Sequence, residues 1–225
     1  MATEVSWADG MVEGRRTAHE FVRESLRRAI LRGDLTGGSR LIQGEVAATL
    51  NVSTTPVREA LRDPATEGLI TLDRHRGGTV RELDWDDMEE IGMVREALDP
   101  LAVRLFCERI TDDQLREAES LWRQMEKQKD LGTWVELNMQ FHFIFHEATG
   151  VGRLVGILKG LEQAAGLYVA QAQRWHPEIR RRANAQHQAL IEQCRRRDAT
   201  KAIEVMEGHA TMALEMTDPG ERKPT

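Results

Sequence analysis

Hydrophobic residues in the first third of the chain recur at spacings of three and four, which is typical of amphipathic helices. The first such run follows Thr17 and consists of Phe21, Val22, Leu26, Ala29 and Ile30. Gly33 and Asp34 end this run, and a loop over 35–39 leads to a second predicted helix at about 43–50.

A third helix is predicted to begin after Ser53, which suits the capping position, and Pro56 is tolerated in its first turn. Val57, Ala60 and Leu61 face inward from this helix. After it come two short β-prone runs, 69–72 and 79–81, joined by a basic turn that contains glycine. Three helices followed by such a hairpin predict a winged helix-turn-helix domain over 15–82.

Beyond a short linker at 83–87, the pattern to residue 216 is helical, and Asp84 or Asp86 is expected to cap the first helix. Breaks near 110–112, 131–133, 149–152, 175–177 and 198–200 leave about six helices, each long enough at roughly 1.5 Å per residue to cross a bundle. The predicted fold class is therefore mainly α, with an all-α antiparallel helical bundle over 83–216 behind the winged helix. Residues 1–14 and 217–225 are expected to be disordered.

Composition agrees with a globular protein, because 40% of the 225 residues are hydrophobic and 30% are charged. No apolar run approaches the roughly 18 residues of a membrane span. The first five residues lack a basic and then apolar signal sequence, so we expect a cytoplasmic protein. Cys107 and Cys194 form no CxxC pair and are expected to be buried or half-buried thiols in a reducing compartment.

Charge is distributed unevenly along the chain. Residues 15–82 carry 12 basic and 9 acidic side chains, whereas residues 83–225 carry 19 basic and 25 acidic ones. An acidic segment repels phosphates, so contact with nucleic acid is expected only in the first third.

The segment from Val52 to Arg62 resembles the recognition helix of the GntR superfamily of bacterial regulators, and the resemblance extends back to Ile30 and forward to Gly77. It implies a double-stranded DNA operator as partner and DNA contacts at Ser53, Thr54, Thr55, Arg58, Arg62, Arg76 and Gly77. Thr55 and Arg58 would meet bases or phosphates in the major groove, since Arg offers a bidentate fork to guanine. Arg76 and Gly77 would approach the minor groove or the backbone.

Three positions depart from that family. Thr54 stands where the family usually has Arg, and Gly44 stands where it often has Arg. We therefore expect an operator that differs from the common family site, or weaker DNA binding. Pro64 replaces an apolar residue, and a proline in a helix interior costs about 3 kcal/mol. The recognition helix is therefore predicted to kink or end near 62–63, with Asp63 outside helical geometry.

The second half of the chain resembles the FCD domain of FadR-like regulators. The match includes the segment from Arg95 to Ala102, with Asp99 in place of the usual Glu, and the later motifs around Asn138, His142, His187 and His209. In that family, these last four positions hold a divalent metal next to a carboxylate-bearing effector. The resemblance also implies a homodimer, which suits a palindromic operator.

The residue types suit that role. Asn138 and His142 are four apart and share one helix face, and three imidazoles favour zinc or nickel while leaving positions open for water or ligand. His146 is expected either to support the ligands from outside the site or to be structural. Because the family mostly has Asp at the position of Asn138, we expect weaker metal binding and stronger attraction of an anionic effector. Arg95 would be the second anchor for the effector's carboxylate.

The sequence is expected to encode a ligand-responsive regulator that represses transcription. Two other functions compete with this expectation. A metal-dependent enzyme lacks support, because the sequence contains no H-E-x-x-H motif, no E-x-x-H pair, no Gly-rich phosphate loop and no nucleophile elbow. A metal-responsive regulator, with the ion itself as signal, stays open, although the ligand set lacks the thiolates of many metal sensors.

Overall fold

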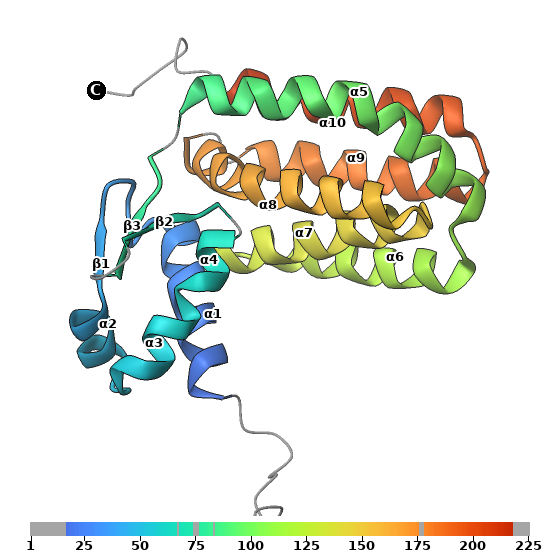
Figure 1. Cartoon of the computed structure of the whole chain (residues 1–225). Coiled ribbons are helices and arrows are strands. Elements are labelled where there is room, and N and C mark those ends of the chain that lie inside the picture. Colours follow the sequence, from blue (N-terminus) through green and yellow to red (C-terminus); the bar gives the residue numbers. More distant parts are fainter. Residues whose placement is uncertain (1–16, 67, 74–76, 83, 176–177, 218–225) are drawn as a thin grey trace, which may run out of the picture.

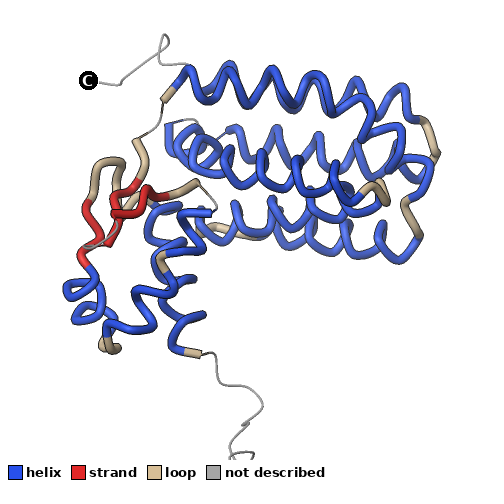
Figure 2. The backbone as a smooth tube through the Cα atoms, in the orientation of Figure 1, coloured by secondary structure: helices blue, strands red, loops and turns tan. Residues whose placement is uncertain are grey.

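The computed structural model describes residues 17–217 except 67, 74–76, 83, 176 and 177. It contains a small N-terminal unit of short helices and strands and a bundle of long helices (Figure 1, Figure 2). The predicted fold class is confirmed. The segments predicted to be disordered lie outside the described residues, apart from Thr217, which is the last residue of a helix.

The first helix, α1 (Ala18–Arg32), has both ends fixed by its sequence. The Thr17 side chain accepts a hydrogen bond from the Glu20 N–H, and the Glu20 carboxylate accepts one from the Thr17 N–H. Gly33 ends the helix in the left-handed conformation, with φ 76°. The buried face of α1 packs on α3 (Thr54–Ala60), which also contacts α2 (Gln43–Leu50).

Three strands form an antiparallel sheet in the order β1-β3-β2. They are β1 (Arg40–Ile42), β2 (Ile70–Asp73) and β3 (Gly77–Val80). The hairpin of β2 and β3 is the predicted one, although β3 begins two residues earlier. The hydropathy pattern did not reveal β1, in which only Leu41 is buried. Gly77 has φ 124°, and a Cβ there would collide with the Leu41 carbonyl oxygen, so the pairing of β1 with β3 requires glycine.

The predicted break in the recognition helix is present, but its position and form differ from the prediction. Helix α3 ends at Ala60, two residues before the predicted point, the chain turns at Leu61, and a separate helix α4 (Arg62–Thr66) follows. The prediction for Asp63 is wrong, because this residue is helical. The reason is that Pro64 is the third residue of α4, where a backbone N–H has no helical acceptor to lose.

Six long helices form the bundle, as predicted. They are α5 (Trp85–Arg109), α6 (Asp112–Lys127), α7 (Leu131–Ala148), α8 (Gly152–Trp175), α9 (Glu178–Arg195) and α10 (Ala199–Thr217). Asp84 caps α5, so the linker is shorter than the predicted 83–87. Asp130 caps α7 by accepting a hydrogen bond from the Thr133 N–H, which places this break before 131–133.

The core of the bundle is aromatic and aliphatic. The rings of Phe141 and Phe106 each pack against Phe145, with centroids 5.0 and 5.2 Å away. Cys107 on α5 and Cys194 on α9 are buried in the same core as free thiols, with their sulfur atoms 3.3 Å apart. The prediction that these thiols are buried is confirmed.

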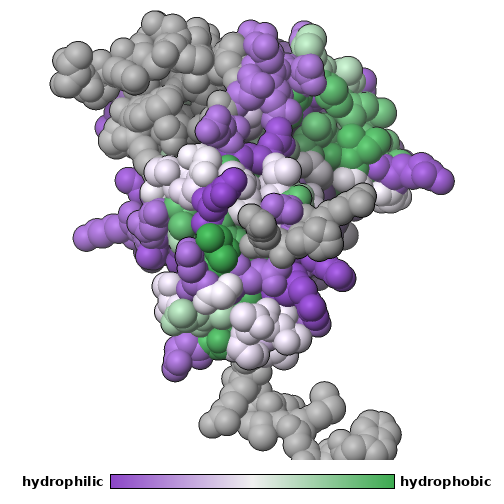
Figure 3. Space-filling model, turned by 60° about the vertical axis from the view of Figure 1, so that its left-hand side comes forward, coloured by the Kyte–Doolittle hydropathy of each residue, from purple (hydrophilic) through white to green (hydrophobic). Residues whose placement is uncertain are grey.

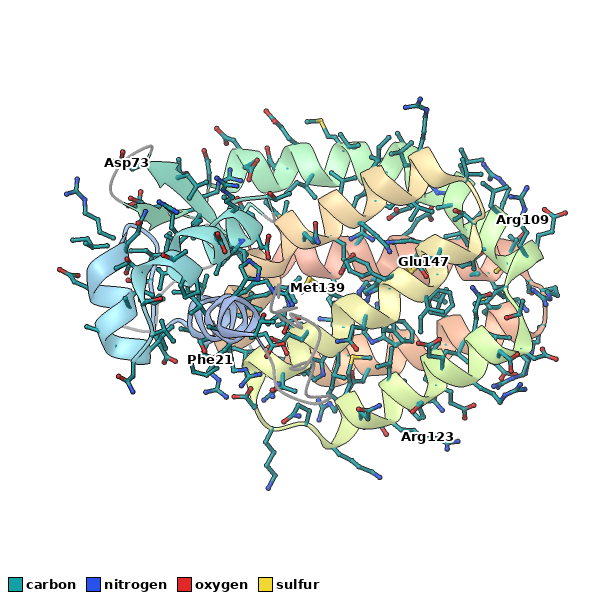
Figure 4. The ribbon with its side chains drawn as sticks, turned by 60° about the horizontal axis from the view of Figure 1, so that its bottom comes forward. Phe21, Asp73, Arg109, Arg123, Met139 and Glu147 are labelled. Atoms are coloured by element: carbon teal, nitrogen blue, oxygen red, sulfur yellow. The ribbon has the colours of Figure 1, made fainter. Side chains whose placement is uncertain are left out.

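The two units meet where α1 packs on α7. Arg32 Nη2 lies 2.8 Å from Asp130 Oδ2, and Arg27 Nη1 lies 3.9 Å from Glu136 Oε1. Arg27 Nη2 also lies 3.3 Å from the sulfur of Met139, which is labelled beside α1 in Figure 4. A movement of α7 would therefore act directly on the first helix of the N-terminal unit.

Candidate functional site

The exposed side of α3 and the start of α4 present the side chains that the resemblance assigns to DNA contact. Exposed there are Ser53, Thr54, Thr55, Arg58 and Arg62. Ser53 occupies the capping position, but its side chain makes no capping hydrogen bond, so the hydroxyl is free for another partner. Among the described residues, no acidic side chain pairs with Arg58 or Arg62, which leaves both guanidinium groups open to an anion.

The wing is only partly described. Arg76 lies outside the described residues, so its predicted DNA contact stays a prediction. Gly77 is buried beside β1, and its backbone role in the sheet accounts for the glycine. The lower part of Figure 3 shows hydrophilic side chains together with neutral and hydrophobic ones.

Three histidines from three helices meet inside the bundle. His142 on α7, His187 on α9 and His209 on α10 each offer a ring nitrogen, and these nitrogens lie within 4.8 Å of one another. Their ring centroids are 4.9–5.2 Å apart. His146, whose ring centroid is 6.4 Å from that of His142, is outside this cluster. The predicted trio is thus brought together in space.

Burial keeps these imidazoles neutral. Desolvation lowers the pKa of His142 and of His187 well below the usual value for histidine, and the neighbouring rings lower it further. It also lowers the pKa of His209 and of His146 to about 4. Neutral imidazole is the form that binds a metal ion, so the cluster is ready to bind one at neutral pH without first losing protons.

Several buried polar atoms around the cluster have no hydrogen-bond partner within the described part of the chain. They are both ring nitrogens of His187, Nδ1 of His146 and Oδ1 of Asn138. His209 differs, because its Nδ1 lies 3.0 Å from the Gln186 amide oxygen, which leaves Nε2 as the nitrogen with a lone pair. A buried acceptor without a hydrogen-bond partner costs free energy. A divalent ion would satisfy the imidazole nitrogens and the Asn138 oxygen, because both atom types are metal ligands.

A charged network borders the cluster. Arg95 Nε lies 3.1 Å from Asp99 Oδ2, and Arg95 Nη1 lies 3.1 Å from Oε2 of Glu162 on α8. Glu162 Oε1 accepts a hydrogen bond from Asn138 Nδ2, at 3.4 Å. Burial raises the pKa of Asp99, and Arg95 opposes this change. The predicted effector anchor, Arg95, is thus already shared by two carboxylates, although its buried Nη2 has no partner among the residues that the structure describes.

A cavity of about 50 Å³ lies beside this network. Its polar end is formed by Arg95, Asn138, Glu162 and His209, and the rest of its lining is mostly apolar. The polar groups of the network thus face a largely apolar space beside His209.

Sequence reasoning missed Glu162. It belongs to no motif that the resemblance covers, yet it is 4% exposed and contacts two predicted site residues. One signal was present, because Glu162 is the only acidic residue in α8. An acidic side chain is rarely buried without a partner or a function.

The fold is a winged-helix unit joined to a bundle of six long helices, with three histidines buried inside the bundle. Residues 90–212 match the FCD domain, and residues 18–80 match the bacterial regulatory proteins of the gntR family. The chain therefore belongs to the gntR family and carries an FCD domain. This is a family of transcriptional regulators, not of enzymes. No helix in the described ranges is long and apolar enough to cross a membrane.

Individual relatives agree with this assignment. The chain is 32% identical over 127 residues to the Nta operon transcriptional regulator of Aminobacter aminovorans, which covers 56% of each protein. It is 40% identical over 91 residues to a "Probable D-xylose utilization operon transcriptional repressor" of Paenarthrobacter nicotinovorans, 40% of each. The chain thus spans about half the length of the curated relatives that it matches. The solved structure of E. coli McbR/YncC has the same fold, with a TM-score of 0.72 at 21% identity over 90% of this chain and 98% of that one.

Proposed function

We propose that the protein is a ligand-responsive transcriptional repressor that binds operator DNA through α3, the start of α4 and the wing. Arg58 and Arg62 support this proposal, because both are exposed and neither has an acidic partner among the described residues. The printed name of the Paenarthrobacter relative describes a repressor. Selection of duplexes from a random pool tests the DNA-binding part. We expect either sequences unlike the common family site or weak binding, whereas enrichment of that site at ordinary affinity would contradict the role given to Thr54.

The bundle is proposed to bind a divalent metal, zinc or nickel, through Asn138, His142, His187 and His209. The observation that carries this proposal is the meeting of three buried, neutral imidazoles within 4.8 Å. The ion would supply positive charge beside the network of Arg95, Asp99 and Glu162. The charges of these three groups sum to one negative charge when all are ionised. An anionic effector is therefore accepted only after metal binding, with the unpaired Nη2 of Arg95 as its second contact.

The alternative is that the ion itself is the signal. Fluorescence anisotropy with a duplex selected by the protein separates the two functions. If zinc alone changes the DNA affinity, the metal is the signal. If affinity changes only when a panel of small organic acids is added with zinc, the metal is part of an effector site. A protein that responds to neither would contradict both functions.

The protein is also proposed to form a homodimer through the bundle. Met93, Val94 and Leu101 on α5 are 62%, 43% and 45% exposed, and Ile157 on α8 is 50% exposed. A hydrophobic area lies on the upper right of the molecule in Figure 3. Two-fold pairing would bring two winged helices to one palindrome. Sedimentation equilibrium should give a dimer that Leu101→Glu converts to monomers, while the exposed control Arg123→Glu leaves it intact.

A further inference from the structure

Glu162 is in an unusual position for an acidic residue. Its side chain is 5% exposed and lies between two elements, with Oε2 on Arg95 of α5 and Oε1 on Asn138 of α7. A buried carboxylate is costly unless it is paired and hydrogen-bonded. Here both oxygens have a donor, so the helix α8 places a compensated negative charge directly beside the histidine cluster.

This carboxylate decides which way the Asn138 amide points. An ionised carboxylate only accepts hydrogen bonds, so the amide must turn its NH2 group toward Glu162. The amide oxygen, Oδ1, is then left on the other side, where it is buried and has no partner in the described part of the chain. Only this orientation offers an oxygen to a metal ion, because an amide NH2 group does not coordinate one.

We propose that Glu162 is the positioning residue of the metal site. It holds the Asn138 amide with its oxygen available as a ligand. Arg95 limits the cost of this arrangement by neutralising Glu162 from the opposite side. The proposal rests on the metal-binding function given above and adds a residue to it that does not itself need to touch the ion.

Glutamine at position 162 tests the orientation. Its amide would turn its oxygen toward Arg95 and its NH2 toward Asn138, so the Asn138 amide would have to reverse and present nitrogen to the site. We therefore expect Glu162→Gln to weaken zinc binding about tenfold or more, as loss of an orienting partner commonly does. Asn138→Asp removes the need for an orienting partner. A carboxylate at 138 accepts from an NH2 donor in either orientation and always presents an oxygen to the site.

The experiment is calorimetric titration of zinc into the metal-free full-length chain and three variants, Glu162→Gln, Asn138→Asp and the double variant. Glu147→Gln, an acid on α7 that is 59% exposed, controls for loss of charge. We expect Glu162→Gln to weaken binding in the presence of Asn138, but not in the presence of Asn138→Asp, and we expect Glu147→Gln to have no effect. Circular dichroism without metal shows whether each variant folds. If Glu162→Gln does not fold, the double variant is compared with Asn138→Asp instead. The double variant again has a donor and an acceptor at this contact.

Two results would overturn the inference while leaving metal binding intact. One is wild-type zinc affinity in Glu162→Gln, and the other is an equal loss of affinity in both backgrounds, which would mean that charge alone matters. A wild-type chain that binds neither zinc nor nickel would overturn the proposed metal site together with this inference.

Discussion

In the N-terminal unit the candidate binding side chains lie on the surface above an apolar core, whereas in the bundle they lie inside the core itself. Arg58 and Arg62 are exposed, but His142 and His187 are 2% and 1% exposed. The difference indicates two kinds of partner. A surface of unpaired arginines suits a large anionic molecule that docks from outside, and a buried cluster suits a small one that enters the fold.

The same difference appears in how well the two units satisfy their own polar groups. Of the buried side-chain atoms without a partner in the described ranges, only Nε of Arg28 belongs to the N-terminal unit. The others belong to the bundle and include atoms of Arg95, Asn138, His146 and His187. Each such group costs about 1–3 kcal/mol when it stays unsatisfied. The bundle therefore has more to gain from a ligand than the winged helix has.

The largest expected effect is stabilisation of the bundle by metal. An ion that binds only the folded state adds about 2.7 kcal/mol to the free energy of unfolding at 100 times its dissociation constant. At roughly 2–4 °C per kcal/mol, zinc should raise the melting temperature on the order of 5–10 °C, as measured by circular dichroism. We expect His187→Ala to remove this shift.

His146→Ala is the matched control for that measurement, because His146 is buried on α7 but lies outside the cluster. This variant should melt at a lower temperature and still respond to zinc. An unchanged zinc response in His187→Ala would contradict the role of His187 as a ligand. Loss of the response in His146→Ala would contradict the placing of His146 outside the metal site.

The second effect concerns the N-terminal surface. Arg58→Ala should weaken binding to a duplex selected by the protein by about 1–3 kcal/mol, because it removes a base or phosphate contact without disturbing the core. Fluorescence anisotropy measures this change. Arg123→Ala on α6, labelled in Figure 4 and 65% exposed, should bind DNA like the wild type. Equal affinities for the two variants would argue against α3 as the reading element.

The smallest effect concerns the junction between the units. Partial burial would raise the pKa of Asp130, but hydrogen bonds from Thr133 and Arg32 outweigh it and lower the pKa to about 2. Asp130→Ala loses both the helix cap and the ion pair and should cost about 1–2 kcal/mol in the free energy of unfolding. Asp130→Asn keeps the cap and should cost less than about 1 kcal/mol.

The pH dependence of the free energy of unfolding tests the charged contribution of Asp130. A carboxyl group whose pKa is lowered on folding stabilises the protein above its unfolded pKa, near 3.8, and loses that contribution as the pH falls toward 2. The difference between wild type and Asp130→Asn should therefore be complete at pH 6 and shrink below about pH 4. Urea unfolding at several pH values measures it, and a constant difference down to pH 2.5 would contradict the ion pair.

The sequence predicted local structure well where caps and helix periodicity decide it. The helix over 43–50 has its predicted bounds, and Asp84 caps α5 as expected. Strand β1 was missed because its three residues pair with β3 nearly 40 residues later, which no local pattern reveals. The end of α3 was misplaced because Pro64 could begin a new helix instead of only breaking an old one.

For the candidate site, the sequence predicted the histidines but not the contact that surrounds them. The resemblance supplied the histidines, and periodicity alone would have shown only that each lies on an inward face. The contact between Asn138 and Glu162 joins residues 24 positions apart on different helices, so it follows from how α7 packs on α8. Packing of this kind depends on the whole core, and a single sequence does not encode it in any short pattern.

The central claim is that the buried histidine cluster is a metal site separate from the exposed DNA-reading surface. The number of zinc ions bound per chain, measured by equilibrium dialysis at neutral pH, tests it most directly. We predict one ion for the wild type and for Arg58→Ala, and none for the double variant His142→Ala/His187→Ala. The same number of ions in the wild type and in the double variant would contradict the claim.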